Sequence, residues 1–208
     1  MPDTDDAETK TRTDRNQLIA AVLLGVAATL TAVAAYSAAL SDGEALEGYT
    51  SSTRTLNDAN AFFAQGNTTE ASDRSLFVEY ANAVYAEDSA RADYLTTLMR
   101  PELQDALDWW QETDEAVTPF DELEGNPYAI DDYATAHELE DEAAVQFDDG
   151  VDADEQGDSF ELAVVFFALA LFFGGVATVF DRQVVTAALL GLAVAVLVVG
   201  SVVYVLAL

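Results

Sequence analysis

The chain contains no cysteine among its 208 residues, and it has only one histidine, His137. Without cysteine, disulfide bonds, cysteine-ligated zinc and thiol catalysis are all excluded. A zinc site needs three or four ligands, so one histidine would leave carboxylates to supply the rest. No serine motif or paired-carboxylate spacing accompanies His137, and a solvated helix face is the favoured interpretation. We therefore predict no catalytic residue, no metal and no cofactor.

Basic residues are also scarce, with 8 Lys and Arg against 38 Asp and Glu and a formal net charge of −30. Residues 41–159 hold 31 of the acidic residues and four arginines, which gives this segment a net charge of −27. A field of this sign repels phosphate backbones, so nucleic acid is excluded as a partner. Uniform acidity is tolerable where salt screens self-repulsion, so we predict a halophilic source, an archaeon.

Charge is absent altogether from three long stretches of the chain. They are residues 18–40, 162–180 and 184–208, of 23, 19 and 25 residues. A helix needs about 20 apolar residues to cross a bilayer, so each stretch predicts a transmembrane helix. A cleaved signal peptide is the competing interpretation of the first stretch, but signal cores usually have about 7 to 15 apolar residues.

These stretches predict an all-α integral membrane protein with three transmembrane helices and a soluble domain folded as a helical bundle. The predicted segments are a tail at 1–17, spans at 18–40, 160–180 and 184–208, an acidic helical domain at 41–159 and a turn at 181–183.

Positive charge close to the spans predicts their orientation. Lys10, Arg12 and Arg15 precede the first span, and Arg182 lies in the turn between the last two. Three spans put both sites on one side, and the positive-inside rule makes that side cytoplasmic. We therefore expect a multi-pass protein of the cell membrane whose acidic domain faces outside.

An N-glycosylation acceptor agrees with this orientation. Asn67, Thr68 and Thr69 form the acceptor triplet, beside Gly66 in what we expect to be a turn. Such acceptors are modified only on translocated segments, so Asn67 is a candidate glycosylation site on an outward domain.

Helical periodicity predicts four helices in the acidic domain. The first begins after the capping residues Ser41 and Asp42 and ends at Gly66 and Asn67. The others are expected at 72–99, from Pro101 onward, and at 131–147, where the last continues with interruption into the second span.

Residues 148–158 partly resemble a calcium-binding loop. Read from Asp152, carboxylates stand at positions 1 and 3 and glycine at position 6. Gln156 stands at position 5, and Ala163 replaces the bidentate glutamate at position 12. We expect loose cation association at most and no specific calcium site.

Small residues recur at four-residue steps within the spans. Ala21, Gly25 and Thr29 form one such stripe, and Ala187, Gly191 and Ala195 form another. Small residues let membrane helices approach closely, so we predict that Gly25, Gly174, Gly175 and Gly191 serve helix packing, within one chain or between copies. The first and third spans contain no Asp, Glu, Lys, Arg or His, which argues against a pump or an ion carrier.

Several stretches together resemble a family of uncharacterised prokaryotic membrane proteins. They are Asp73–Tyr80, Arg100–Leu103, Asn126–Tyr128, Gly157–Phe160 and Phe166–Gly175. The resemblance implies one N-terminal span, a helical soluble segment and a C-terminal two-span hairpin. It implies no activity and no catalytic residue.

The sequence thus favours a non-enzymatic membrane protein whose outward domain acts as an interaction or assembly module. Its expected partners are the lipid bilayer and either further copies of itself or other membrane proteins. A passive channel or a transport accessory subunit is the alternative, with the spans of several copies lining a pore. An envelope-facing enzyme using His137 and nearby carboxylates is a third hypothesis.

Overall fold

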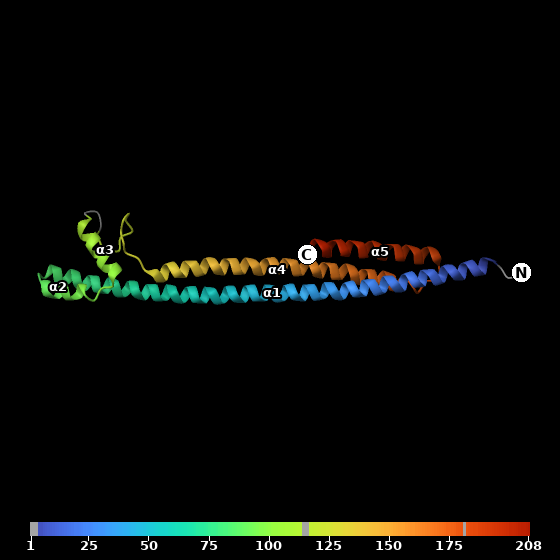
Figure 1. The fold of residues 1–208 in the computed structure, drawn as a ribbon, viewed down its shortest axis with the longest axis horizontal. Coiled ribbons are helices and arrows are strands. Elements are labelled where there is room, and N and C mark those ends of the chain that lie inside the picture. Colours follow the sequence, from blue (N-terminus) through green and yellow to red (C-terminus); the bar gives the residue numbers. More distant parts are fainter. Residues whose placement is uncertain (1–3, 114–116, 181) are drawn as a thin grey trace. The chain divides into compact units, whose positions relative to one another are not determined.

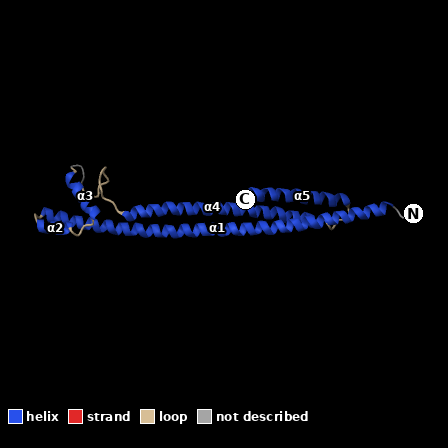
Figure 2. Ribbon diagram, viewed as in Figure 1, coloured by secondary structure: helices blue, strands red, loops and turns tan. Residues whose placement is uncertain are grey.

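The computed structural model describes residues 4–113, 117–180 and 182–208, with side chains from Gln17 onward. Figures 1 and 2 show helices joined by loops, the longest of them between α3 and α4, and no described residue lies in a strand. The helices are α1 (Thr4–Tyr85), α2 (Ser89–Thr96), α3 (Pro101–Glu112), α4 (Asp131–Ala177) and α5 (Gln183–Leu206). Three of them, α1, α4 and α5, contain stretches long and apolar enough to cross a membrane. The prediction of an all-α fold with three spanning helices is therefore confirmed.

The described residues fall into two compact units. The first, called here the span unit, comprises residues 1–50 and 146–208 and contains the apolar parts of α1 and α4 together with α5. The second, called here the polar unit, comprises residues 51–145 and contains the C-terminal part of α1, α2, α3 and the start of α4.

A separate helix was predicted to start after Ser41 and to end at Gly66. Helix α1 instead runs through both positions without a break, so both predicted boundaries are wrong. Ser41 is buried, and its hydroxyl donates to Gln156 Oε1 at 3.2 Å instead of capping a helix. Gly66 lies against the ring of Tyr133, where an added Cβ would be 2.6 Å from Cε1. Both residues therefore serve contacts with α4 that local sequence signals do not reveal.

Helix α1 ends at Tyr85, within the single helix predicted for 72–99. The amide of Glu87 donates to the carbonyl of Val84, and the amide of Asp88 donates to the carbonyl of Ala83. This pair of hydrogen bonds is the Schellman ending, which needs a left-handed residue, and Glu87 occupies that position with φ of 59°. Asp88 then caps α2 by accepting from the amide of Arg91 at 3.1 Å.

Replacing Glu87 with glycine is expected to stabilise the polar unit. Glycine adopts a left-handed conformation without the Cβ penalty, so the free energy of unfolding should rise by about 1 kcal/mol. Thermal unfolding followed by circular dichroism would measure the change. Glu87→Ala keeps the Cβ and is the control, and a lower melting temperature for Glu87→Gly than for Glu87→Ala would contradict the assignment.

The predicted beginnings of α3 and α4 are confirmed. Pro101 occupies the first turn of α3, where its missing amide hydrogen costs nothing, and α4 begins at Asp131. The interruption expected in α4 before the second span is wrong. Residues 148–158 are helical, and Gly150 and Gly157 within them are buried.

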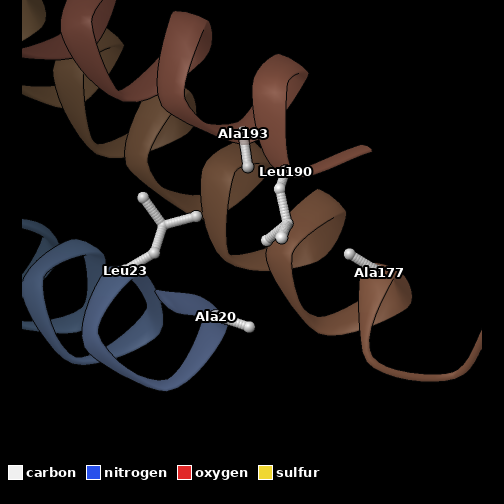
Figure 3. Packing of buried hydrophobic residues seen from close by; sticks show 5 residues of the cluster. All are labelled: Ala20, Leu23, Ala177, Leu190 and Ala193. Atoms are coloured by element: carbon white, nitrogen blue, oxygen red, sulfur yellow. The ribbon is translucent and has the colours of Figure 1, made fainter. Parts of the chain in front are cut away.

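The apolar side chains of the span unit pack between its three helices. Figure 3 shows Ala20 and Leu23 of α1 facing Ala177 of α4 and Leu190 and Ala193 of α5. A second cluster gathers around the buried Ala34, Ala163 and Phe167, with Leu197 and Val203 of α5 against it. The three apolar helices thus form one bundle with a shared core.

Polar contacts join the same three helices around Gln156 of α4. Its amide oxygen accepts from Ser41 of α1, and its amide nitrogen donates to the carbonyl of Ala207 at 2.9 Å. The hydroxyl of Tyr204 lies 3.1 Å from that of Ser37. Gln156 therefore satisfies a carbonyl at the C-terminal end of α5 that has no partner in its own helix.

Candidate functional site

Three distant parts of the chain meet at Asp73 of α1 in the polar unit. Arg100, before α3, donates from Nε to Asp73 Oδ2 at 2.6 Å, and the hydroxyl of Tyr128 donates to the same oxygen at 3.0 Å. Arg100 also donates to Glu102 Oε2 at 3.0 Å and to the carbonyl of Ala129 at 2.7 Å. The side chain of Asp73 is only 5% exposed. We call Asp73, Arg100 and Tyr128 the acid–arginine cluster.

The acid–arginine cluster joins three of the stretches that carry the family resemblance. Asp73, Arg100 and Tyr128 belong one each to Asp73–Tyr80, Arg100–Leu103 and Asn126–Tyr128. Sequence reasoning assigned none of the three a role. Arg100 is one of four arginines among residues 41–159, and spacing alone cannot show which of them is paired with a buried carboxylate.

Burial raises the pKa of the Tyr128 phenol well above its ordinary value of 10, and the neighbouring Asp73 carboxylate adds to the shift. Arg100 opposes the shift only in part. Tyr128 therefore keeps its proton at neutral and moderately alkaline pH, and it acts as a hydrogen-bond donor.

Stability is accordingly expected to fall at alkaline pH. The pKa of Tyr128 is higher in the folded chain than in the unfolded one, so its contribution is complete below about pH 10 and is lost as pH rises further. Urea unfolding measured above about pH 10 should show that the free energy of unfolding falls more steeply with pH in the wild type than in Tyr128→Phe. Tyr85→Phe, which removes a phenol that is 93% exposed, is the control. Equal pH dependence in the wild type and Tyr128→Phe would contradict this assignment.

Aromatic rings extend from the acid–arginine cluster into the core of the polar unit. Phe120 meets Tyr128 edge to face at 4.9 Å between centroids, and Phe77 meets Phe120 and Trp110 at 5.6 and 5.3 Å. Such edge-to-face pairs add stability beyond the area that they bury. The guanidinium carbon of Arg74 lies 4.6 Å from the centre of the Phe120 ring.

A polar cavity of about 290 Å³ lies beside these rings. It is lined in part by Glu70, Arg74, Phe120 and Tyr133. Arg74 pairs with Glu70 at 2.7 Å, and the Tyr133 hydroxyl donates to the other Glu70 oxygen at 2.9 Å. The hydrogen bond from Arg74, followed by that from Tyr133, lowers the pKa of Glu70. Glu70 and Arg74 are thus paired with each other, which suits a rigid surface.

The loop before α4 is held in place by its own side chains. Asp121 accepts from the hydroxyl of Thr118 at 2.7 Å and from the amide of Val117 at 2.6 Å. These hydrogen bonds, that of Thr118 first, lower the pKa of Asp121. Asn126 donates to the carbonyl of Asp121 and accepts from the amide of Tyr128. The loop therefore presents Tyr128 to Asp73 in a fixed position.

Asn67 lies inside α1, so the turn predicted around it is wrong. Its side-chain oxygen lies 2.9 Å from the hydroxyl oxygen of Tyr133, whose proton is donated to Glu70. The turn was wrong because Gly66 is read as a helix end from sequence, whereas here it makes room for the ring of Tyr133. The acceptor triplet itself is unaffected, so glycosylation of Asn67 stays a prediction.

His137 occupies an exposed position on α4. Its Nδ1 lies 3.1 Å from Glu140 Oε2, and its ring meets Phe63 edge to face at 5.2 Å. Within the described ranges, no group of three or more His, Asp and Glu side chains is placed to hold a metal ion.

The four glycines predicted to serve helix packing differ in their surroundings. Gly174 is buried, and an added Cβ would lie 3.2 Å from Leu24 Cδ2 of α1. A Cβ added at Gly25, Gly175 or Gly191 would meet nothing within 4 Å in the described part of the chain. Gly174 therefore packs within the chain, whereas Gly25 and Gly191 lie on outer faces of the bundle.

Besides Gly66, four close-packing glycines were missed. A Cβ at Gly48 would lie 2.7 Å from the Cα of Gly150, and one at Gly150 would lie 3.0 Å from the ring of Tyr49. A Cβ at Gly157 would meet Asp42 at 2.8 Å, and one at Gly200 would meet Phe166 at 2.8 Å. A seven-residue step could have found part of this pattern, because Ala20, Ala27, Ala34, Ser41 and Gly48 share it.

The fold defines an all-α protein with three helices suited to crossing a membrane, which is consistent with a multi-pass membrane protein. No family model matches the chain, and neither a curated protein nor a solved structure shows significant similarity to it. The family resemblance thus stays a prediction.

Proposed function

We propose that this protein is a non-enzymatic membrane protein that assembles through its spans and presents the polar unit as an interaction module outside the cell. The observation that carries the proposal is the placement of the two small-residue stripes. Ala21, Gly25 and Thr29 are exposed on α1, away from the buried Ala20 and Ala27.

The second stripe has the same character. Ala187, Gly191 and Ala195 are exposed on α5, whereas Leu190 and Ala193 are buried. Small residues on a lipid-facing surface allow another helix to approach closely, which supports assembly of several copies. The outward orientation is supported by the positive charge of Lys10 and its neighbours before the first span.

Disulfide cross-linking in native membranes tests the assembly. The chain has no cysteine, so single cysteines at Gly25 and at Ile19 report two different faces of the same helix. Gly25→Cys is expected to give disulfide-linked dimers under mild oxidation and Ile19→Cys much less. Only monomer from Gly25→Cys, and likewise from Gly191→Cys, would exclude assembly through these faces.

Orientation is tested separately with a membrane-impermeant thiol reagent on intact cells. A cysteine at Ser89 in the polar unit is expected to react, whereas one at Gln183, beside Arg182, is expected to react only after permeabilisation. The opposite pattern would place the polar unit in the cytoplasm and overturn the outward part of the proposal.

A further inference from the structure

A groove lies on the span unit between α1 and α4. Its volume is about 430 Å³, and it is lined in part by Ala35 and Ala39 of α1 and Val165 of α4. Volumes of this size are typical of small-molecule sites in proteins. Alanine side chains on one helix leave the groove open, and the valine gives it an apolar wall.

Two carboxylates line the same groove, Asp42 of α1 and Glu161 of α4. Neither forms an ion pair or a hydrogen bond with another side chain in the described part of the chain. A net negative charge therefore stands beside an apolar surface without a cation to balance it.

The depth of Glu161 makes this charge unusual. On α4, Gly157 lies against Ala38 and Asp42, and Ala163 packs in one cluster with Ala34. Glu161 therefore lies level with residues between 34 and 38, inside the uncharged stretch 18–40. Carboxylates at such depths are costly when unpaired, and they commonly mark functional positions.

We propose that this groove binds an amphiphile with a cationic headgroup, such as an alkylammonium, at the border of the membrane. The headgroup lies between Asp42 and Glu161, and the alkyl chain follows the alanines of α1 towards the centre of the span. Charge selects this occupant, because an anionic amphiphile would be repelled by both carboxylates. A second copy docked by the same face would bring further carboxylates against them.

Cysteine protection tests the proposal on the full chain in dodecyl maltoside, a neutral detergent. Ala39→Cys places a thiol in the groove, and Val33→Cys places one on another exposed face of the same span. The rate of alkylation by N-ethylmaleimide is measured as dodecyltrimethylammonium is added. We expect dodecyltrimethylammonium to slow alkylation at position 39 and not at position 33. Position 33 thus also controls for any general effect of the cation on thiol reactivity.

Charge-removing variants identify the recognition groups. For each of the variants Glu161→Gln and Asp42→Asn, we expect that half-maximal protection requires about ten times more dodecyltrimethylammonium. Asp158→Asn removes an exposed carboxylate that does not line the groove and should leave protection unchanged.

Several results would overturn the proposal. Absence of protection at position 39, or equal protection by the anionic N-lauroylsarcosine, would show that the groove does not select a cation. Protection that survives both charge-removing substitutions would exclude Asp42 and Glu161 as its binding groups. Disulfide-linked dimers of the Ala39→Cys variant would show that a second copy covers the groove.

Discussion

Arg100→Gln is expected to destabilise the polar unit by about 3 kcal/mol, because it leaves the carboxylate of Asp73 buried without a counter-charge. The Asp73 side chain is 5% exposed, and Arg100 supplies its only ion pair among the described residues. Glutamine keeps hydrogen-bonding capacity but no charge. The loss in the free energy of unfolding would therefore measure the cost of leaving a buried carboxylate without a counter-charge.

Tryptophan fluorescence suits this measurement, because both tryptophans lie in α3 and Trp110 packs against Phe77. Urea unfolding in detergent would give the free energy. Arg91→Gln is the matched control, since the ion pair of Arg91 with Glu79 is about half exposed on both sides and should contribute less than about 1 kcal/mol. Equal losses for the two variants would show that burial does not decide the effect.

A double variant separates loss of charge from loss of packing. Replacing Asp73 with leucine and Arg100 with methionine removes both charges and keeps apolar volume. Buried ion pairs replaced in this way often lose little stability. We expect the double variant to be more stable than Arg100→Gln alone, and a larger loss would mean that the hydrogen bonds of Arg100 to Ala129 and Glu102 dominate.

Gly48→Leu is expected to force α1 and α4 apart in the span unit, at a cost of about 3 kcal/mol. A Cβ at Gly48 would lie 2.7 Å from the Cα and 2.8 Å from the backbone nitrogen of Gly150. A backbone cannot yield as a flexible side chain can, so the helices themselves must shift. A lower melting temperature by circular dichroism in detergent would measure the effect.

Gly43→Leu provides a control of opposite sign on the same helix. A Cβ at Gly43 would meet nothing within 4 Å among the described residues, and leucine is the better helix former by somewhat less than about 1 kcal/mol. We therefore expect Gly43→Leu to preserve or raise the melting temperature. Equal losses at both positions would indicate a general intolerance of large side chains in α1 and would refute the close approach at Gly48.

Much of the architecture could be predicted from sequence because it depends on local properties. The length of an uncharged stretch decides whether a helix can cross a bilayer, and the three stretches identified the three apolar helices. Pro101 marked the start of α3, since proline is suited only to the first turn.

The helix boundaries that failed depend on partners distant in sequence. Glycine beside asparagine predicts a helix end, yet Gly66 continues α1 because the Tyr133 ring of α4 fills the space beside it. The actual end of α1 depends on Glu87 in a left-handed conformation, which glutamate seldom adopts.

The sequence by itself determined the helical class, the number of apolar helices and the distribution of charge, because hydrophobicity and helix length act locally along the chain. Only the tertiary structure decided which small residues face a neighbouring helix and which face outward. It also decided that Asp73, Arg100 and Tyr128 meet. Such contacts depend on the register between helices, and that register is fixed by packing across the whole interface.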